Sequence, residues 1–214
     1  MTVEDGWPAL RTPRPDREGG ASMFGRLSQC NGRMNRTLFL MATVLVGVAA
    51  CRAKQVTDLH ALVVDLESAD AEKSGKARLR LIEIGEPAAL VIGERLQSGD
   101  ARVKQAMATT LWGMGSAGRA AVPALGAALA DADREVRLAA AMALGNMGAD
   151  AAAAVPALVL TLEDPELEVR RWAIKALGNI GLAASEALPA VDRARKVEGL
   201  RMAAEEAIRQ IQGR

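Results

Sequence analysis

Few residues of this 214-residue chain belong to the types that usually carry chemistry. There is one histidine, His60, and there are two cysteines, Cys30 and Cys51. Neither a disulfide framework nor a His/Cys metal cluster can be assembled from so few ligands. No serine lies in a G-x-S-x-G motif, and His60, between Leu59 and Ala61, fits an exposed or capping position better than a catalytic one. We therefore expect no catalytic residue, no cofactor and no bound metal.

Composition excludes two further classes of protein. The chain carries 27 basic and 26 acidic side chains, so it has no basic excess with which to neutralise the phosphates of a nucleic acid. Half of its residues are hydrophobic, which argues against a disordered chain. We expect a folded protein that does not bind nucleic acid.

The chain before Cys51 contains two segments of different character. Residues 1–33 mix prolines, glycines and scattered charges without an apolar period, and we interpret them as an unstructured leader. Residues 38–50 (LFLMATVLVGVAA) form an uncharged run that follows Arg33 and Arg36. A bilayer-spanning helix needs roughly 20 apolar residues, whereas this shorter run has the length of a signal-peptide core. We therefore predict a signal peptide at residues 34–50.

The end of this run resembles the lipobox of bacterial lipoproteins, since Val48, Ala49 and Ala50 precede Cys51. The resemblance implies a diacylglycerol group on the Cys51 sulfur, cleavage before Cys51 and acylation of the new amino terminus. Several acyl chains hold a protein stably in a bilayer. Residues 51–56 would then be an anchor linker. Because Arg52 follows the cysteine, the resemblance favours the periplasmic face of the outer membrane over retention in the inner membrane.

Two alternatives to this lipid anchor remain open. Residues 38–50 could be a short transmembrane anchor with residues 1–33 inside the cell, or a buried helix in which Cys51 is incidental. A lipoprotein signal normally begins at the chain terminus, and Met34 is a plausible start. We therefore hypothesise that residues 1–33 come from an over-extended gene start.

Residues 57–214 contain a repeat of 33 residues. Four columns of identical residues keep this spacing in three units: Val103, Val136 and Val169; Leu111, Leu144 and Leu177; Gly115, Gly148 and Gly181; Pro123, Pro156 and Pro189. An earlier unit joins the same register 30 residues upstream, where Gly85 precedes Gly115. So regular a period is the signature of a solenoid.

Each unit is predicted to form two helices. Apolar residues within 136–144 follow the stripe of an amphipathic helix, which Gly145 and Gly148 are expected to end. Pro156 then opens a second helix, in the first turn where its missing N–H is harmless. No alternating strand pattern occurs, so we expect an all-α domain, with capping helices at residues 57–68 and 200–211.

The segments ADREVRLAAAMALGNMG and PELEVRRWAIKALGNIG resemble HEAT repeats, specifically the short type named after phycobilisome lyases. The resemblance covers residues 56–214 and implies an α-solenoid of about four helix pairs. It also implies that a protein partner binds along the groove lined by the second helices. Those helices offer Ala124, Ala127, Ala128, Thr161 and Arg193.

The same resemblance implies a structural ladder between neighbouring units, built from Asp131, Arg137, Asp164 and Arg170. An aspartate near the start of a helix and an arginine in its first turn are favourable places for these charges. The preceding unit has Ser98 and Lys104 at the corresponding positions, so we expect the ladder to be weak or broken there.

Two tryptophans interrupt the repeat. Trp112 stands where later units have Gly145 and Gly178, and Trp172 stands where other units have alanine. Either side chain could pack against the adjoining unit or mark a binding edge, because tryptophan is enriched among interface anchors.

These observations favour a non-catalytic, lipid-anchored interaction or scaffold module of the bacterial cell envelope, with an unidentified protein partner. The alternative is an enzyme, or an accessory subunit of one, of the phycobilisome-lyase-like type. Some HEAT-like proteins are iron enzymes that bind the metal through repeated His-Glu pairs, which one histidine cannot supply.

Overall fold

The computed structural model describes residues 58–213 of the chain, which belong to the unit Arg52–Arg214. The predicted leader, signal peptide, lipobox, Cys51 and anchor linker all lie outside the described residues. Within 58–213 the regular structure is helical and there is no strand. Residues 58–66 form a helix, and the following elements are α2 (Ala71–Ile84), α3 (Glu86–Leu96), α4 (Ala101–Met114), η1 (Gly115–Ala121), α5 (Val122–Ala128), α6 (Arg134–Met147), η2 (Gly148–Ala154), α7 (Val155–Thr161), α8 (Leu167–Ile180), η3 (Gly181–Ala187), α9 (Leu188–Ala194) and α10 (Arg201–Ile211).

The first helices of the repeat, α4, α6 and α8, have 14 residues each. Aspartates cap two of them: Asp100 accepts a hydrogen bond from the N–H of Val103 at 2.8 Å, and Asp133 accepts one from Glu135 at 2.8 Å. Such side chains satisfy N–H groups that have no partner within the helix. The repeated valines then face the core, as the apolar period predicts.

Each first helix ends at a glycine in a left-handed conformation. Gly115, Gly148 and Gly181 have φ angles of 54°, 57° and 71°, which strain residues that carry a Cβ. The prediction that Gly145 helps to end its helix is wrong, because α6 continues to Met147. Gly145 is instead buried where α6 meets α8: a Cβ at this position would lie 3.3 Å from the Cα of Ala176. Gly145 therefore permits a close approach of two helices.

A 3₁₀ segment follows each of these glycines and was not predicted. The second helices, α5, α7 and α9, start after it and have seven residues each. Pro123, Pro156 and Pro189 lie in their first turns, as predicted.

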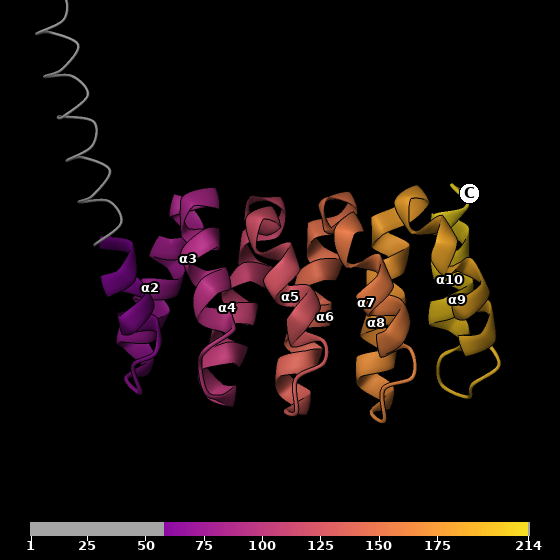
Figure 1. Cartoon of the computed structure of the whole chain (residues 1–214), viewed down its shortest axis with the longest axis horizontal. Coiled ribbons are helices and arrows are strands. Elements are labelled where there is room, and N and C mark those ends of the chain that lie inside the picture. Colours follow the sequence, from indigo (N-terminus) through magenta and orange to yellow (C-terminus); the bar gives the residue numbers. More distant parts are fainter. Residues whose placement is uncertain (1–57, 214) are drawn as a thin grey trace, which may run out of the picture. The chain divides into compact units, whose positions relative to one another are not determined.

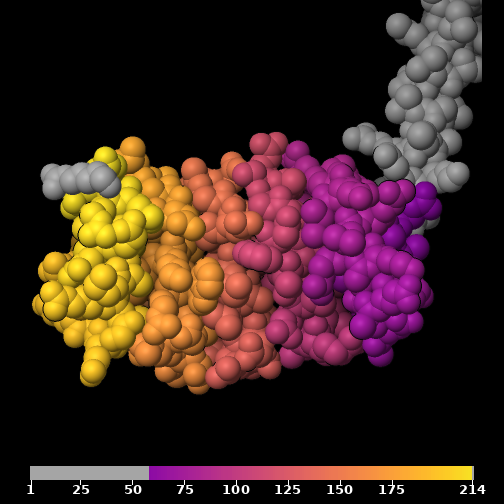
Figure 2. Space-filling view, turned by 180° about the vertical axis from the view of Figure 1, so that it is seen from behind, coloured from indigo at the N-terminus to yellow at the C-terminus, as the bar shows by residue number. Residues whose placement is uncertain are grey.

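The helix pairs stand side by side in the order of the sequence (Figure 1). Helix α4 contacts α6, α6 contacts α8, and α8 contacts α10, while the second helices pack against the first. In the space-filling view the units follow one another as adjoining bands (Figure 2). The described part of the chain is therefore an all-α solenoid, which confirms the predicted fold class.

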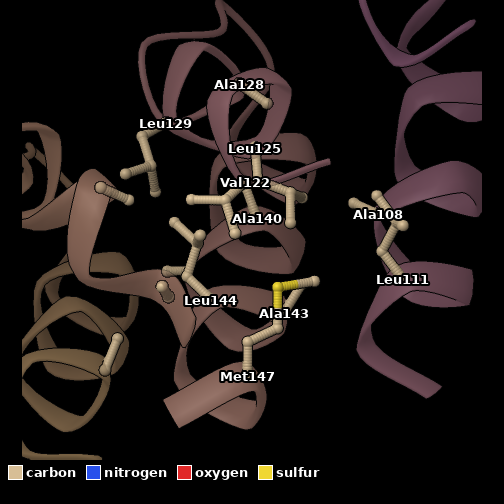
Figure 3. Close-up of a cluster of buried hydrophobic side chains, with 14 of the residues drawn as sticks. Ala108, Leu111, Val122, Leu125, Ala128, Leu129, Ala140, Ala143, Leu144 and Met147 are labelled. Carbon is tan, nitrogen blue, oxygen red and sulfur yellow. The ribbon is translucent and has the colours of Figure 1, made fainter. Parts of the chain in front are cut away.

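The core is a continuous row of small aliphatic side chains. Figure 3 shows one stretch of it, in which Leu125 of α5 lies near Leu144 of α6, and Leu111 of α4 is buried on the facing side. Alanines fill much of the remaining space, including Ala140 and Ala143, which are fully buried. Such thin side chains let the helices stack closely.

One described stretch, Arg134–Thr161, is long and apolar enough to cross a membrane by length and composition. It comprises α6, η2 and α7, and the positive φ of Gly148 interrupts it. Both helices pack within the solenoid, so core packing accounts for its apolar character.

Candidate interaction surfaces

The charged ladder joins residues from neighbouring units. Lys104 at the start of α4 donates a hydrogen bond to Asp131 in the next unit, with 2.7 Å between Nζ and Oδ2. One unit further, Arg137 donates two hydrogen bonds to Asp164, from Nε to Oδ2 at 2.6 Å and from Nη2 to Oδ1 at 3.2 Å. The two residues of each pair lie 27 residues apart, so a cation on the first helix of one unit reaches the loop before the first helix of the next unit.

The ladder is interrupted only in part where the sequence suggested. Lys104 forms its ion pair with Asp131, so the prediction of a weak or broken ladder is wrong for the cation of this unit. Ser98 supplies no carboxylate, and the hydrogen bonds of its hydroxyl are with Arg95, three residues earlier.

A second interruption lies at the other end of the ladder. To form the same ion pair, Arg170 would need a carboxylate at position 197, 27 residues onward, but this position holds Val197. Its Nη1 donates to backbone carbonyls of the loop before α8, as that of Arg137 does before α6, but its buried Nε has no partner among the described residues.

The electrostatics of the ladder follow from these contacts. The hydrogen bond from Lys104 is the largest cause that holds the pKa of Asp131 below its ordinary value, and a hydrogen bond from the backbone of Asp133 adds to it. The hydrogen bond to Asp164 raises the pKa of Arg137. Because these side chains are largely buried, the rungs hold units together and present little charge to a ligand.

A second ladder, which the sequence analysis missed, ties the other ends of the first helices. The side-chain amide of Asn146 donates to the carbonyl oxygen of Trp112 at 2.7 Å, and that of Asn179 donates to the carbonyl oxygen of Gly145 at 2.9 Å. These carbonyls lie in the last turn of the preceding unit's first helix, where the N–H groups of the capping residues Gly115 and Gly148 also donate to them. The sequence does contain a signal for this second ladder, since the two asparagines keep the 33-residue spacing.

The two tryptophans lie two units apart, on α4 and α8, with α6 between them. The side chain of Trp112 is 43% exposed at the end of α4. Trp172 is half-buried and packs against the core, and the Nζ atom of Lys175 lies 4.5 Å from the centre of its ring.

Two grooves hollow the surface of the solenoid. The first has a volume of about 490 Å³ and lies between α5 and α7. Small residues such as Gly126, Ala127 and Ala157 line it, together with Leu160 and the ion-paired Arg137 and Asp164. The second groove also has a volume of about 490 Å³ and lies between α8 and α10, beside Trp172.

The first groove corrects the surface expected for the second helices. Ala124, Ala128 and Thr161 are buried and present little surface, although Thr161 contributes to the lining of the groove, whereas Ala127 and Arg193 are exposed. The most prominent apolar side chain was not anticipated: Leu160 is 78% exposed. Among residues 58–213, no cluster of three or more His, Cys, Asp or Glu side chains could hold a metal ion.

Comparison with known proteins matches this geometry. A family described as HEAT repeats matches residues 88–155, and one described as HEAT repeat matches residues 154–184. No curated protein sequence matches the chain.

Three solved structures show the same fold. An engineered protein is 24% identical, with a TM-score of 0.54, over 75% of this chain and 83% of its own. The complex of CpcE and CpcF of phycocyanin lyase from Nostoc sp. PCC7120 gives 24% identity and a TM-score of 0.56, over 73% of this chain and 65% of that chain. A designed armadillo repeat protein in complex with the peptide (KR)4 gives 20% identity and a TM-score of 0.55, over 89% of this chain and 100% of its own.

The repeat period and the helix pairs thus agree with the family matches, and residues 88–184 of the chain are HEAT repeats within an α-solenoid.

Proposed function

We propose that this protein is a non-catalytic interaction or scaffold module that Cys51 anchors by lipid to the bacterial cell envelope, on the periplasmic face of the outer membrane. The lipobox-like residues Val48, Ala49 and Ala50 support the anchor, and the solenoid supports the binding of a protein partner. Solenoids expose extended surfaces on which a partner can contact several repeats at once.

The groove between α5 and α7 is the feature that most directly supports the interaction role. Gly126, Ala127, Ala130 and Ala157 form part of its lining, and at these small residues the backbone of a partner can approach closely. Leu160 projects beside it with most of its surface in contact with solvent, which is costly unless a partner covers it. Single exposed leucines are common, but an exposed leucine beside an apolar groove marks a binding surface.

The second candidate is an accessory subunit or enzyme of the phycobilisome-lyase type. The similarity to the CpcE and CpcF complex favours it, at an identity of 24% that shows the fold alone. This chain spans 65% of the length of that chain.

A pull-down distinguishes these candidates. The soluble Cys51→Ser protein is immobilised and exposed to an envelope extract, beside Leu160→Glu as the groove variant and Leu79→Glu as its control. Leu79 is an exposed leucine on α2, outside both grooves. We expect specific proteins that the parent and the Leu79 variant retain and that the Leu160 variant loses. Equal retention by all three would reject the groove, and catalytic turnover without any partner would reject the non-catalytic role.

A further inference from the structure

The groove between α8 and α10 has a chemical character that the first groove lacks. Arg171, Trp172 and Lys175 reach it from α8, and Met202 and Glu206 reach it from α10. It therefore combines an aromatic ring, a thioether and charged groups.

The earlier units of the same solenoid show that its packing does not demand these α8 residues. The corresponding positions hold Gln105 and Leu138 for Arg171, Ala106 and Ala139 for Trp172, and Thr109 and Met142 for Lys175. Helices α4 and α6, which carry those residues, pack against each other as α6 and α8 do. The aromatic and cationic side chains are thus specific to this groove.

One charge in the groove is left uncompensated. Arg171 forms an ion pair with Glu168, and Glu206 forms one with Arg209. In the part of the chain that the structure describes, no carboxylate lies within ion-pair distance of Lys175. Its ammonium group stays above the Trp172 ring, 4.5 Å from the centre, where the electrons of the ring attract it. The groove therefore presents a net positive charge at an aromatic surface.

The rest of the groove is apolar and adaptable. Met202 is 77% exposed at its rim, and Ala203 and Ala207 line the wall formed by α10. A flexible thioether beside a ring suits apolar side chains of various shapes. Apolar surface next to an unpaired cation complements a segment in which an apolar side chain neighbours a carboxylate.

We propose that the α8–α10 groove is a second docking site, which binds a partner protein through an acidic and apolar segment. The carboxylate of that segment pairs with Lys175, and its apolar side chain packs between Trp172 and Met202. This inference rests on the proposed function in that it requires a protein partner, but it uses a different surface from the α5–α7 groove.

The test uses the full chain and two fluorescent peptides of equal length, one that alternates leucine with aspartate and one that alternates leucine with lysine. Binding is followed by fluorescence anisotropy in the parent and in Lys175→Met and Trp172→Ala, which install the residues of the preceding unit, Met142 and Ala139. Because α6 tolerates these residues, both variants should fold, and circular dichroism verifies this. Trp112→Ala is the matched control, since it removes an exposed ring outside the groove.

We expect the leucine–aspartate peptide to bind the parent and the Trp112 variant, and to bind each groove variant about tenfold more weakly. Added salt should weaken binding to the parent more than binding to Lys175→Met. Absence of binding to the parent, binding to both groove variants as tight as binding to the parent, or binding of the leucine–lysine peptide as tight as that of the leucine–aspartate peptide would each overturn the proposal. The envelope pull-down would be unaffected by such a failure, because it depends on Leu160.

Discussion

Single glycines decide how closely neighbouring first helices approach. A Cβ on Gly178 would lie 3.0 Å from the Cα of Ala207 in α10, whereas a Cβ on Gly75 in α2 would meet no atom within 4 Å. We expect Gly178→Ala to lower the free energy of unfolding by about 1–3 kcal/mol, because the backbone of α10 must shift. Gly75→Ala should raise it by about 0.5–1 kcal/mol, since it only removes backbone freedom from the unfolded chain.

Urea denaturation monitored by circular dichroism measures both glycine variants. Equal effects at Gly178 and Gly75 would show that the two helices do not approach as closely as described.

A second residue-scale prediction concerns the charge of Asp131. Its pKa is lower in the folded chain than its ordinary value of 3.8, because Lys104 donates a hydrogen bond to it. Ionised Asp131 therefore stabilises the fold above that ordinary pKa, and this contribution is lost as the pH falls through the lower folded value. Asp131→Asn, whose amide oxygen can still accept the hydrogen bond from Asp133, should cost about 1 kcal/mol at neutral pH and progressively less below about pH 4.

Denaturant titrations of the parent and of Asp131→Asn across this pH range measure the difference. A difference that did not shrink in acid would show that the ion pair is not its source.

At the scale of elements, the ladder stops where the last loop meets α8. The backbone N–H of Val197 donates to the carbonyl three residues earlier at 3.0 Å, as those of Asp131 and Asp164 do at 3.2 and 3.1 Å. Position 197 therefore has the local geometry of a rung, and its valine is 42% exposed. We expect Val197→Asp to pair with the unpartnered Nε of Arg170 and to raise the free energy of unfolding by about 1 kcal/mol.

The control for this rung is a double-mutant cycle with Arg170→Met, in which the gain from Val197→Asp should disappear. Persistence of the gain would assign it to the loop itself. Arg170→Ala alone leaves no side-chain carboxylate unpaired. Arg137→Ala, in contrast, would leave the buried carboxylate of Asp164 without its cation.

The repeat period predicts the helix pairs well, because glycine and proline recur at the ends of elements where their backbone properties are needed. It does not separate Gly145, which permits packing, from Gly148, which ends a helix, since only tertiary contact distinguishes them. The 3₁₀ segments escaped prediction because their alanine-rich sequences carry no period of their own. The period alone likewise does not pair Arg137 with Asp164, 27 residues away in the next unit; only the resemblance to HEAT repeats implied a ladder that contains both.

At the scale of the whole molecule, the two grooves lie on different helices and could serve two partners or one extended partner. The α5–α7 groove is mostly apolar, and the charges of Arg137 and Asp164 in its lining are paired, while the α8–α10 groove carries the uncompensated charge of Lys175. Their occupancy should therefore respond differently to salt, since screening weakens ion pairs and leaves apolar contacts largely intact.

The proposed anchor would determine where these surfaces are displayed, so its chemistry tests the central claim most directly. The measurement is mass spectrometry of the amino terminus of the native protein, isolated from the cells that make it. The account predicts a chain that begins at Cys51 and carries the mass of several acyl groups, held stably in the membrane fraction. Peptides from residues 1–33, or an unmodified Cys51, would contradict it.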